Sequence, residues 1–173
     1  MSALSVLYLV LPFTLVFILH DLEEVAVQHW WMMRHREMLA RRFPKLRRLI
    51  AYLCGLGTWA FAVAALEELV VIILATCYIL IQGIYCMEVW SALFIAFSVH
   101  LLIHICQAVM VRGYVPGLVT SILLLPYSYI GLESINHVMS CMEMVVCGAC
   151  GIVFMALNLL FAHRIGQLGS KKY

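Results

Sequence analysis

Histidines and carboxylates stand at helical spacing in two separate stretches of this chain. In the first stretch, Glu23 and Glu24 follow His20 by three and four residues, and in the second stretch His104 follows His100 by four. Side chains at such spacings share one face of an α-helix. Imidazole together with carboxylate is the ligand set of zinc, iron and manganese sites, which helix bundles build from inward-facing side chains. We therefore predict a divalent metal, zinc, iron or manganese, bound between these two faces.

Two pairs of adjacent glutamates, Glu23-Glu24 and Glu67-Glu68, supply the carboxylates. Neighbours on a helix point about 100° apart, so only one member of each pair can face the centre of a bundle squarely. The spacing leaves open which member does so, and the other can act as a general base. We assign His20, Glu23, Glu67, His100 and His104 as metal ligands, Glu24 and Glu68 as catalytic residues, and Gln107 and Tyr114 as supporting residues.

The composition places these polar residues in a membrane protein. Of the 173 residues 65% are hydrophobic and 12% are charged, whereas soluble domains are near half apolar and a quarter charged. The formal net charge of +2 gives no case for nucleic acid binding. A membrane span needs roughly 20 apolar residues. The expected fold is a single all-α domain over residues 1–173, an integral membrane bundle of five transmembrane helices at about 3–33, 55–81, 89–111, 116–132 and 142–162.

The basic residues predict how this bundle is oriented. Seven of the 11 lysines and arginines fall in a basic loop at 34–48, and the others are Arg112 and three residues at the C-terminal end. With five crossings, all 11 lie on one side of the membrane. The positive-inside rule then predicts an external N-terminus and a cytoplasmic C-terminus. We expect a multi-pass protein of the cell (inner) membrane whose partners are the lipid bilayer and an apolar or lipid-like substrate. The sequence does not decide between a monomer and a homo-oligomer.

Depth in the bilayer tests whether the two polar faces can meet. At 1.5 Å per residue, the face with His20 and the Glu23-Glu24 pair lies about 15–21 Å from Arg34. The face with His100 and His104 lies about 12–18 Å from Arg112, so the two faces are at similar depths. Glu67 would lie about 28 Å from Arg48, which is too deep to match. The mismatch disappears if 49–54 lies along the interface and the span begins near 55–57. The mixture of basic and apolar residues in this stretch favours such an interfacial segment.

The motifs resemble those of the HXXEE-motif family, small polytopic membrane proteins of unassigned function. The name-giving motif stands here as His20-Asp21-Leu22-Glu23-Glu24, and a second Y-x-P-G signature as Tyr114-Val115-Pro116-Gly117. A further family histidine is similar to His100 or His104. The resemblance implies a multi-pass membrane protein and supports the polar site, but it implies no reaction. Three of the predicted residues lie outside these signatures: Glu67, Glu68 and Gln107.

Three functions fit this pattern. The first is a membrane-embedded metal-dependent enzyme acting on a lipid or isoprenoid-like substrate by hydrolysis or isomerisation, because an apolar substrate reaches such a site laterally. The second is a proton-coupled carrier or ion-translocating protein that uses the His/Glu chain as a relay, although no inverted repeat is visible. The third is a structural protein whose polar cluster fixes helix register. A carboxylate at this depth costs about 2.5–3.5 kcal/mol, which favours a functional role for the cluster.

Overall fold

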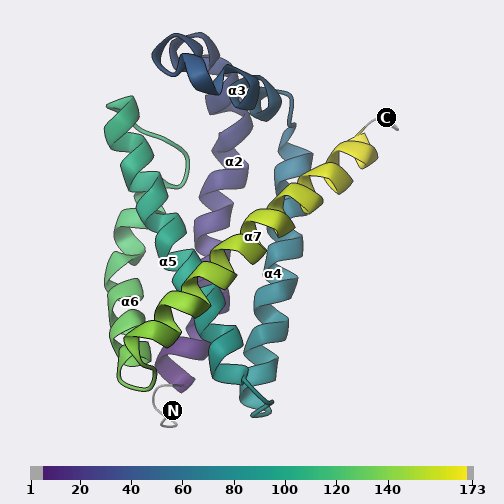
Figure 1. The fold of residues 1–173 in the computed structure, drawn as a ribbon. Helices are drawn as coiled ribbons and strands as arrows, with labels where there is room; N and C mark the ends of the chain where they lie inside the picture. The colour runs from purple at the N-terminus through teal and green to yellow at the C-terminus, as the bar shows by residue number, and fades with distance from the viewer. Residues whose placement is uncertain (1–5, 171–173) are drawn as a thin grey trace.

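A computed structural model describes residues 6–170, and the regular elements of this part of the chain are all helical (Figure 1). Five long helices form a bundle, and one short helix, α3, lies across the end of it. A π-helical turn, η1, precedes the first long helix, and a 3-10 turn, η2, precedes α3. The elements in chain order are η1 (Val6–Val10), α2 (Leu11–Arg42), η2 (Pro44–Leu46), α3 (Arg47–Cys54), α4 (Thr58–Leu80), α5 (Cys86–Val111), α6 (Leu118–Asn136) and α7 (Cys141–Ser170).

Within residues 6–170, four helices are long and apolar enough to cross a membrane. They are α4, α5, α6 and the Cys141–Ala162 part of α7. The fifth span expected from the sequence corresponds to α2, which falls outside this group because acidic residues interrupt its apolar sequence. The protein is therefore an all-helical, multi-pass membrane protein with four candidate spans. Lys171 and Lys172, on which part of the predicted orientation rests, lie outside the described residues.

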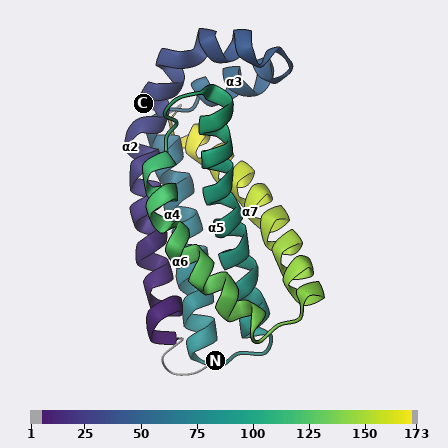
Figure 2. The same cartoon turned by 90° about the vertical axis from the view of Figure 1, so that its left-hand side faces the viewer.

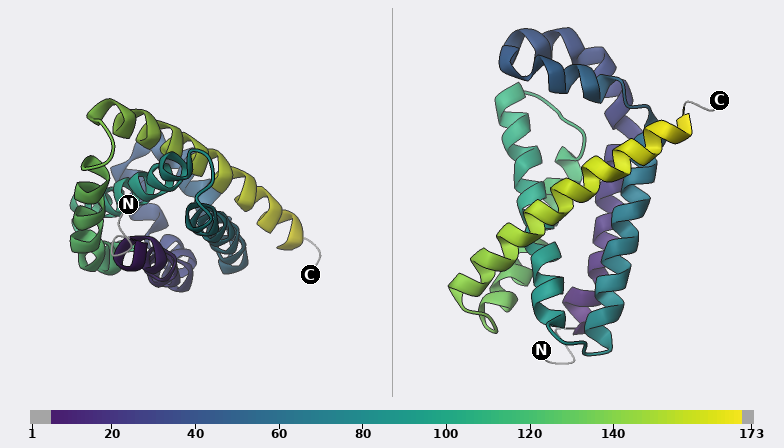
Figure 3. Two further views of the ribbon diagram at one scale, coloured as in Figure 1. Left: turned by 90° about the horizontal axis from the view of Figure 1, so that it is seen from below. Right: turned by 45° about the vertical axis from the view of Figure 1, so that its right-hand side comes forward.

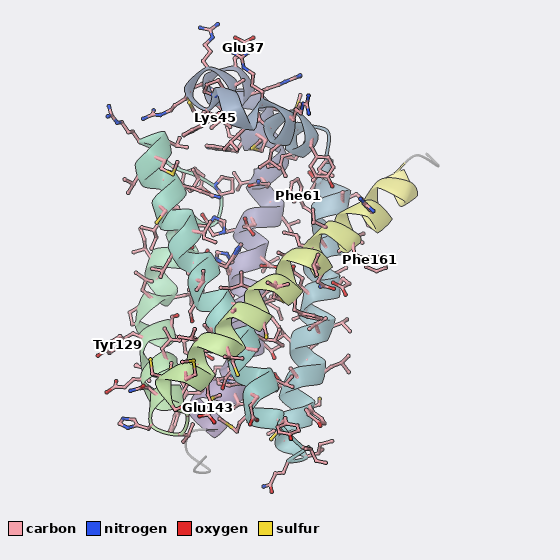
Figure 4. The ribbon with its side chains drawn as sticks, viewed as in Figure 1. Glu37, Lys45, Phe61, Tyr129, Glu143 and Phe161 are labelled. Carbon is pink, nitrogen blue, oxygen red and sulfur yellow. The ribbon has the colours of Figure 1, made fainter. Side chains whose placement is uncertain are left out.

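The helix α7 crosses the bundle diagonally and packs on α5 and α4 (Figures 1 and 3). Its backbone comes very close to α5, since a Cβ added at Gly151 would lie 2.1 Å from the carbonyl oxygen of Ala92. Small residues allow this kind of close approach between membrane helices. Most of α7 faces outward, and Phe161, for example, points away from the bundle (Figure 4). An outer surface of apolar side chains suits contact with lipid.

A cluster of buried aromatic rings sets the register between α2 and α5. Phe13 of α2 meets Trp90, Phe94 and Phe97 of α5 with ring centroids 5.8, 5.2 and 5.5 Å apart. Edge-on and tilted arrangements at these distances are favourable aromatic contacts. Two helical turns further along α2, the His20 ring lies edge-on to Phe97 at 5.7 Å. This packing brings the histidine of α2 to the level of the histidines on α5.

The basic segment 34–48, expected as a loop, is largely helical. α2 continues to Arg42 because residues 34–42 contain no glycine or proline and several strong helix formers. Pro44 then ends the helix, since the residue before a proline disfavours helical geometry. α3 follows and lies across the bundle end (Figure 2). The chain turns at 55–57, and α4 begins at Thr58, close to the predicted start of the second span near 55–57.

Candidate functional site

Three histidines and one glutamate converge between α2 and α5. His20 and Glu24 of α2 and His100 and His104 of α5 each offer one ligand atom, and the four atoms lie within 4.8 Å of one another. The Nε2 atoms of the two α5 histidines are 2.9 Å apart. The two carboxylate oxygens of Glu24 lie 3.5 and 3.4 Å from these nitrogens. Ligands held about 2.0–2.1 Å from a tetrahedral zinc ion are roughly 3.3 Å apart, so this donor set fits a divalent metal.

The burial of these histidines leaves ring nitrogens without a partner. His20 is completely buried and His104 is 4% exposed. In the described part of the protein, His20 Nε2 and His104 Nδ1 are buried and accept or donate no hydrogen bond. Buried polar atoms are paired in the great majority of cases, so each exception calls for an explanation. The centroid of the His20 ring lies 5.0 Å from the ring centroids of both α5 histidines. A metal ion bound among the four side chains would explain why His20 Nε2 has no partner.

A hydrogen-bond chain fixes which nitrogen of His20 carries the proton. The Thr120 hydroxyl lies 2.6 Å from Glu23 Oε2 and 2.9 Å from His20 Nδ1. A carboxylate only accepts hydrogen bonds, so the single hydroxyl proton goes to Glu23 and the hydroxyl oxygen accepts from His20 Nδ1–H. Neutral His20 therefore has its lone pair on Nε2, the atom without a partner. Metal-binding histidines are commonly oriented in this way by a hydrogen bond at the other nitrogen.

Glu23 caps the first turn of α6 from the neighbouring helix. Its Oε2 accepts a hydrogen bond of 2.8 Å from the Thr120 backbone N–H, and its Oε1 accepts one of 3.3 Å from Val119. The Tyr114 hydroxyl donates to Oε1 at 2.8 Å. A negative charge here satisfies N–H groups that have no partner within the helix. Burial and the bond to Glu23 raise the pKa of Tyr114 to about 12, so this phenol stays a donor at neutral pH.

The turn before α6 is shaped around His104. Gly117 has φ +80°, and a Cβ at this position would lie 2.9–3.1 Å from three atoms of the His104 ring. Glycine adopts this left-handed conformation without steric cost, and any side chain would also press on the imidazole. Glycine at position 117 therefore allows the backbone of the Tyr114–Gly117 turn to lie directly against the histidine cluster.

The remaining predicted residues lie around this group rather than within it. Glu68 lines a cavity of about 260 Å³ together with Glu24 and His100. Glu67 instead accepts a hydrogen bond from Asn158 of α7. Gln107 lines a separate pocket under α3. The convergent group thus contains Glu24 of the first glutamate pair and neither member of the second.

Two residues of this region escaped the reasoning from sequence. Thr120 joins Glu23 to His20, and Asn158 holds Glu67. A hydroxyl three residues after Pro-Gly, in the first turn of a predicted helix, is a signal that could have suggested a role for Thr120. Asn158 is an isolated amide in an apolar run, and its partner becomes apparent only when α7 crosses α4.

Fold and site together define a class: multi-pass helical membrane proteins with a histidine–glutamate group in the bundle interior. The family of proteins of unknown function with an HXXEE motif matches residues 11–131. This range is more than half of the chain, and the chain belongs to that family. It includes both helices of the site and the Tyr114–Gly117 turn. No curated protein and no solved structure matches the chain.

Proposed function

We propose that this protein is a membrane-embedded, metal-dependent enzyme that acts on a lipid or isoprenoid-like substrate by hydrolysis or isomerisation. The observation that carries the proposal is the unpaired, buried Nε2 of His20 beside His100, His104 and Glu24. These four side chains would hold the ion, for which zinc, iron and manganese are the candidates. A bound divalent ion supplies Lewis-acid chemistry that polarises an oxygen of the substrate or of water.

The chain's own groups account for positioning and proton transfer. Glu23 and Thr120 hold His20 in the tautomer that leaves Nε2 free. Glu68 lies in the wall of the adjoining cavity with Glu24 and His100, so its carboxylate is the proposed general acid–base group. Glu24, one of the four convergent side chains, takes the ligand role that the sequence leaves open between the members of its pair.

The cavity next to the cluster supports an apolar substrate. Its walls come from α2, α4, α5 and α7, and Phe17, Ile72 and Leu93 are among the mostly apolar residues that line it. Its ionisable lining residues include Glu68 and His100. Apolar pockets with a few convergent polar groups are typical of small-molecule sites. A molecule with a hydrocarbon body and one polar end matches this distribution.

We further propose that α2 is a fifth span and that the N-terminus lies outside. The 32 residues of α2 are about 48 Å long at 1.5 Å per residue, enough to cross a bilayer. Glu23 and Glu24 both have partners inside the bundle, which offsets the cost of charge at this depth. Lys45 lies at the α3 end of the molecule, opposite Glu143 (Figure 4). The α3 end would face the cytoplasm.

Metal analysis of the purified protein tests the enzyme proposal. We expect about one zinc, iron or manganese ion per chain, lost in His20→Ala and His104→Ala. His137→Ala, an exposed histidine after α6, is the control and should retain the metal. Wild-type protein without stoichiometric metal would contradict the proposal, as would a His104→Ala variant that keeps it.

Vesicles containing the protein separate an enzyme from a proton carrier. An imposed pH gradient should decay no faster than in empty vesicles if the site performs chemistry on a substrate. Rapid collapse of the gradient, abolished in His20→Ala, would instead establish a proton relay through the His/Glu chain.

A further inference from the structure

An open pocket rich in arginine lies at the end of the bundle where α2 and α5 finish. Its volume is about 780 Å³, and four guanidinium groups line it. Glu37 is the one carboxylate among its lining residues, and it pairs with Arg41 at 3.5 Å through side chains that are 87% and 82% exposed. Exposed ion pairs of this kind contribute little and separate readily. Four positive charges against one negative charge leave an excess of three. The arginines are Arg34, Arg41, Arg42 and Arg112.

The fold holds these arginines together from two separate helices. Arg42 donates from Nη1 to the carbonyl of Val111 at 3.0 Å, which ties the end of α2 to the end of α5. Arg112 follows in the left-handed conformation, with φ 57°. Arg34 lies over the Trp30 ring at 5.4 Å. Cation–π contact of this kind orients the guanidinium at the surface. The cluster is therefore a built feature of the bundle end.

We propose that this pocket binds the phosphate headgroup of an anionic membrane phospholipid. Guanidinium groups bind phosphate through paired, charge-assisted hydrogen bonds. The pocket lies where α5, a candidate membrane span, ends at Val111, and the end of a membrane span is where a helix meets lipid headgroups. Glu37 marks this end of the molecule in Figure 4. The site is separate from the histidine cluster and does not depend on the proposed enzyme activity.

A neighbouring apolar pocket favours a lipid over free phosphate as the source of this group. It has a volume of about 190 Å³, and Leu39, Phe43 and Val111 are among its lining residues. Each of these is adjacent in sequence to a lining residue of the arginine pocket. Neighbouring residues on a helix lie about 100° apart, so the two pockets occupy adjacent faces of the same helix ends. A phospholipid can place its headgroup in one pocket and part of an acyl chain in the other.

Native mass spectrometry of the whole protein in detergent tests the proposal. Phosphatidylglycerol should bind more tightly than phosphatidylcholine, with an affinity that falls as salt rises. The double variant Arg41→Gln/Arg112→Asn should bind phosphatidylglycerol about 25-fold more weakly, from about five-fold for each arginine. Asparagine is chosen at 112 because it tolerates the left-handed conformation. Arg48→Gln, an exposed arginine of α3 outside the pocket, is the matched control and should bind like the wild type.

Three outcomes would overturn the proposal. Equal binding of the two phospholipids would remove the charge requirement, and unchanged binding by the double variant would remove the pocket. Inorganic phosphate that binds on its own and displaces the lipid at millimolar concentration would assign the site to a free anion. If the double variant does not fold, Glu37→Gln gives a test of opposite sign. Loss of the one carboxylate should tighten phosphatidylglycerol binding about five-fold, and a decrease would contradict the proposal.

Discussion

Replacing Thr120 by valine tests the link between Glu23 and the histidine cluster. Valine has nearly the same shape as threonine but lacks the hydroxyl that contacts His20 at 2.9 Å and Glu23 at 2.6 Å. The backbone N–H of residue 120 can still donate to Glu23, so the cap on α6 is retained in part. The specific loss is the acceptor for His20 Nδ1–H, and with it the preference for the tautomer that leaves Nε2 free.

The size of this effect follows from the role of such partners in metal sites. Loss of the hydrogen bond that orients a ligating histidine typically weakens metal affinity by 10–100-fold, which is about 1.4–2.8 kcal/mol. We therefore expect Thr120→Val to bind zinc 10–100-fold more weakly than the wild type in a competition titration with a chromophoric chelator. Thr120→Ser keeps the hydroxyl and should bind within a few-fold of the wild type.

A second measurement makes this prediction independent of metal affinity. In metal-free protein labelled with ¹⁵N-histidine, His20 should give the NMR shifts of an imidazole protonated at Nδ1. Thr120→Val should lose this tautomer preference, and Thr120→Ser should keep it. The reasoning is refuted if folded Thr120→Val, with wild-type helix content by circular dichroism, retains both the tautomer and the metal affinity. It is also refuted if the serine and valine variants are equally impaired.

Three further predictions concern stability in detergent, measured by thermal or denaturant unfolding. Gly117→Ala should destabilise the protein by more than ~1 kcal/mol, because alanine disfavours φ +80° and its methyl group would press on the His104 ring. Gly113→Ala is the control: a Cβ at this position meets nothing within 4 Å, so the stability should change little. Asn158→Leu should cost about 1–3 kcal/mol by leaving the Glu67 carboxylate without its amide donor, and a double variant with leucine at both positions should recover most of that loss. Tyr114→Phe removes a hydroxyl donor from a partly exposed hydrogen bond, so a loss of about 1 kcal/mol is expected, and an unchanged midpoint would show that the bond contributes nothing.

Helical spacing and membrane depth were sufficient to predict that the polar faces of α2 and α5 meet. His100 and His104 share a face, and their level matches that of His20, which the structure reproduces. The spacing could not choose between Glu23 and Glu24, because this depends on how α2 is rotated about its own axis. That rotation is set by aromatic packing around Phe13, a long-range contact that a single sequence does not reveal.

The segment 34–48 was misjudged for a different reason. The sequence predicts a basic loop at 34–48, but charge does not prevent a helix from forming. α2 continues to Arg42 and ends there because Pro44 disfavours helical geometry at Phe43. The partner of Glu67 could not be predicted because it lies on α7, far along the sequence. The position of Thr120 in the first turn of α6 suggests a role, but its contacts with Glu23 and His20 depend on how α6 packs against α2.

The carboxylate of Glu23 connects α2 to parts of the chain about a hundred residues away. It caps α6, accepts a hydrogen bond from the Tyr114 hydroxyl and, through Thr120, determines which nitrogen of His20 is protonated. If the start of α6 moves away from α2, these contacts are lost together, and His20 loses the acceptor that keeps Nε2 free. The position of the Tyr114–Gly117 turn and the ability of the histidines to bind a cation are therefore coupled. A ligand that displaces this turn would change the affinity of the cluster without touching any of its four donors.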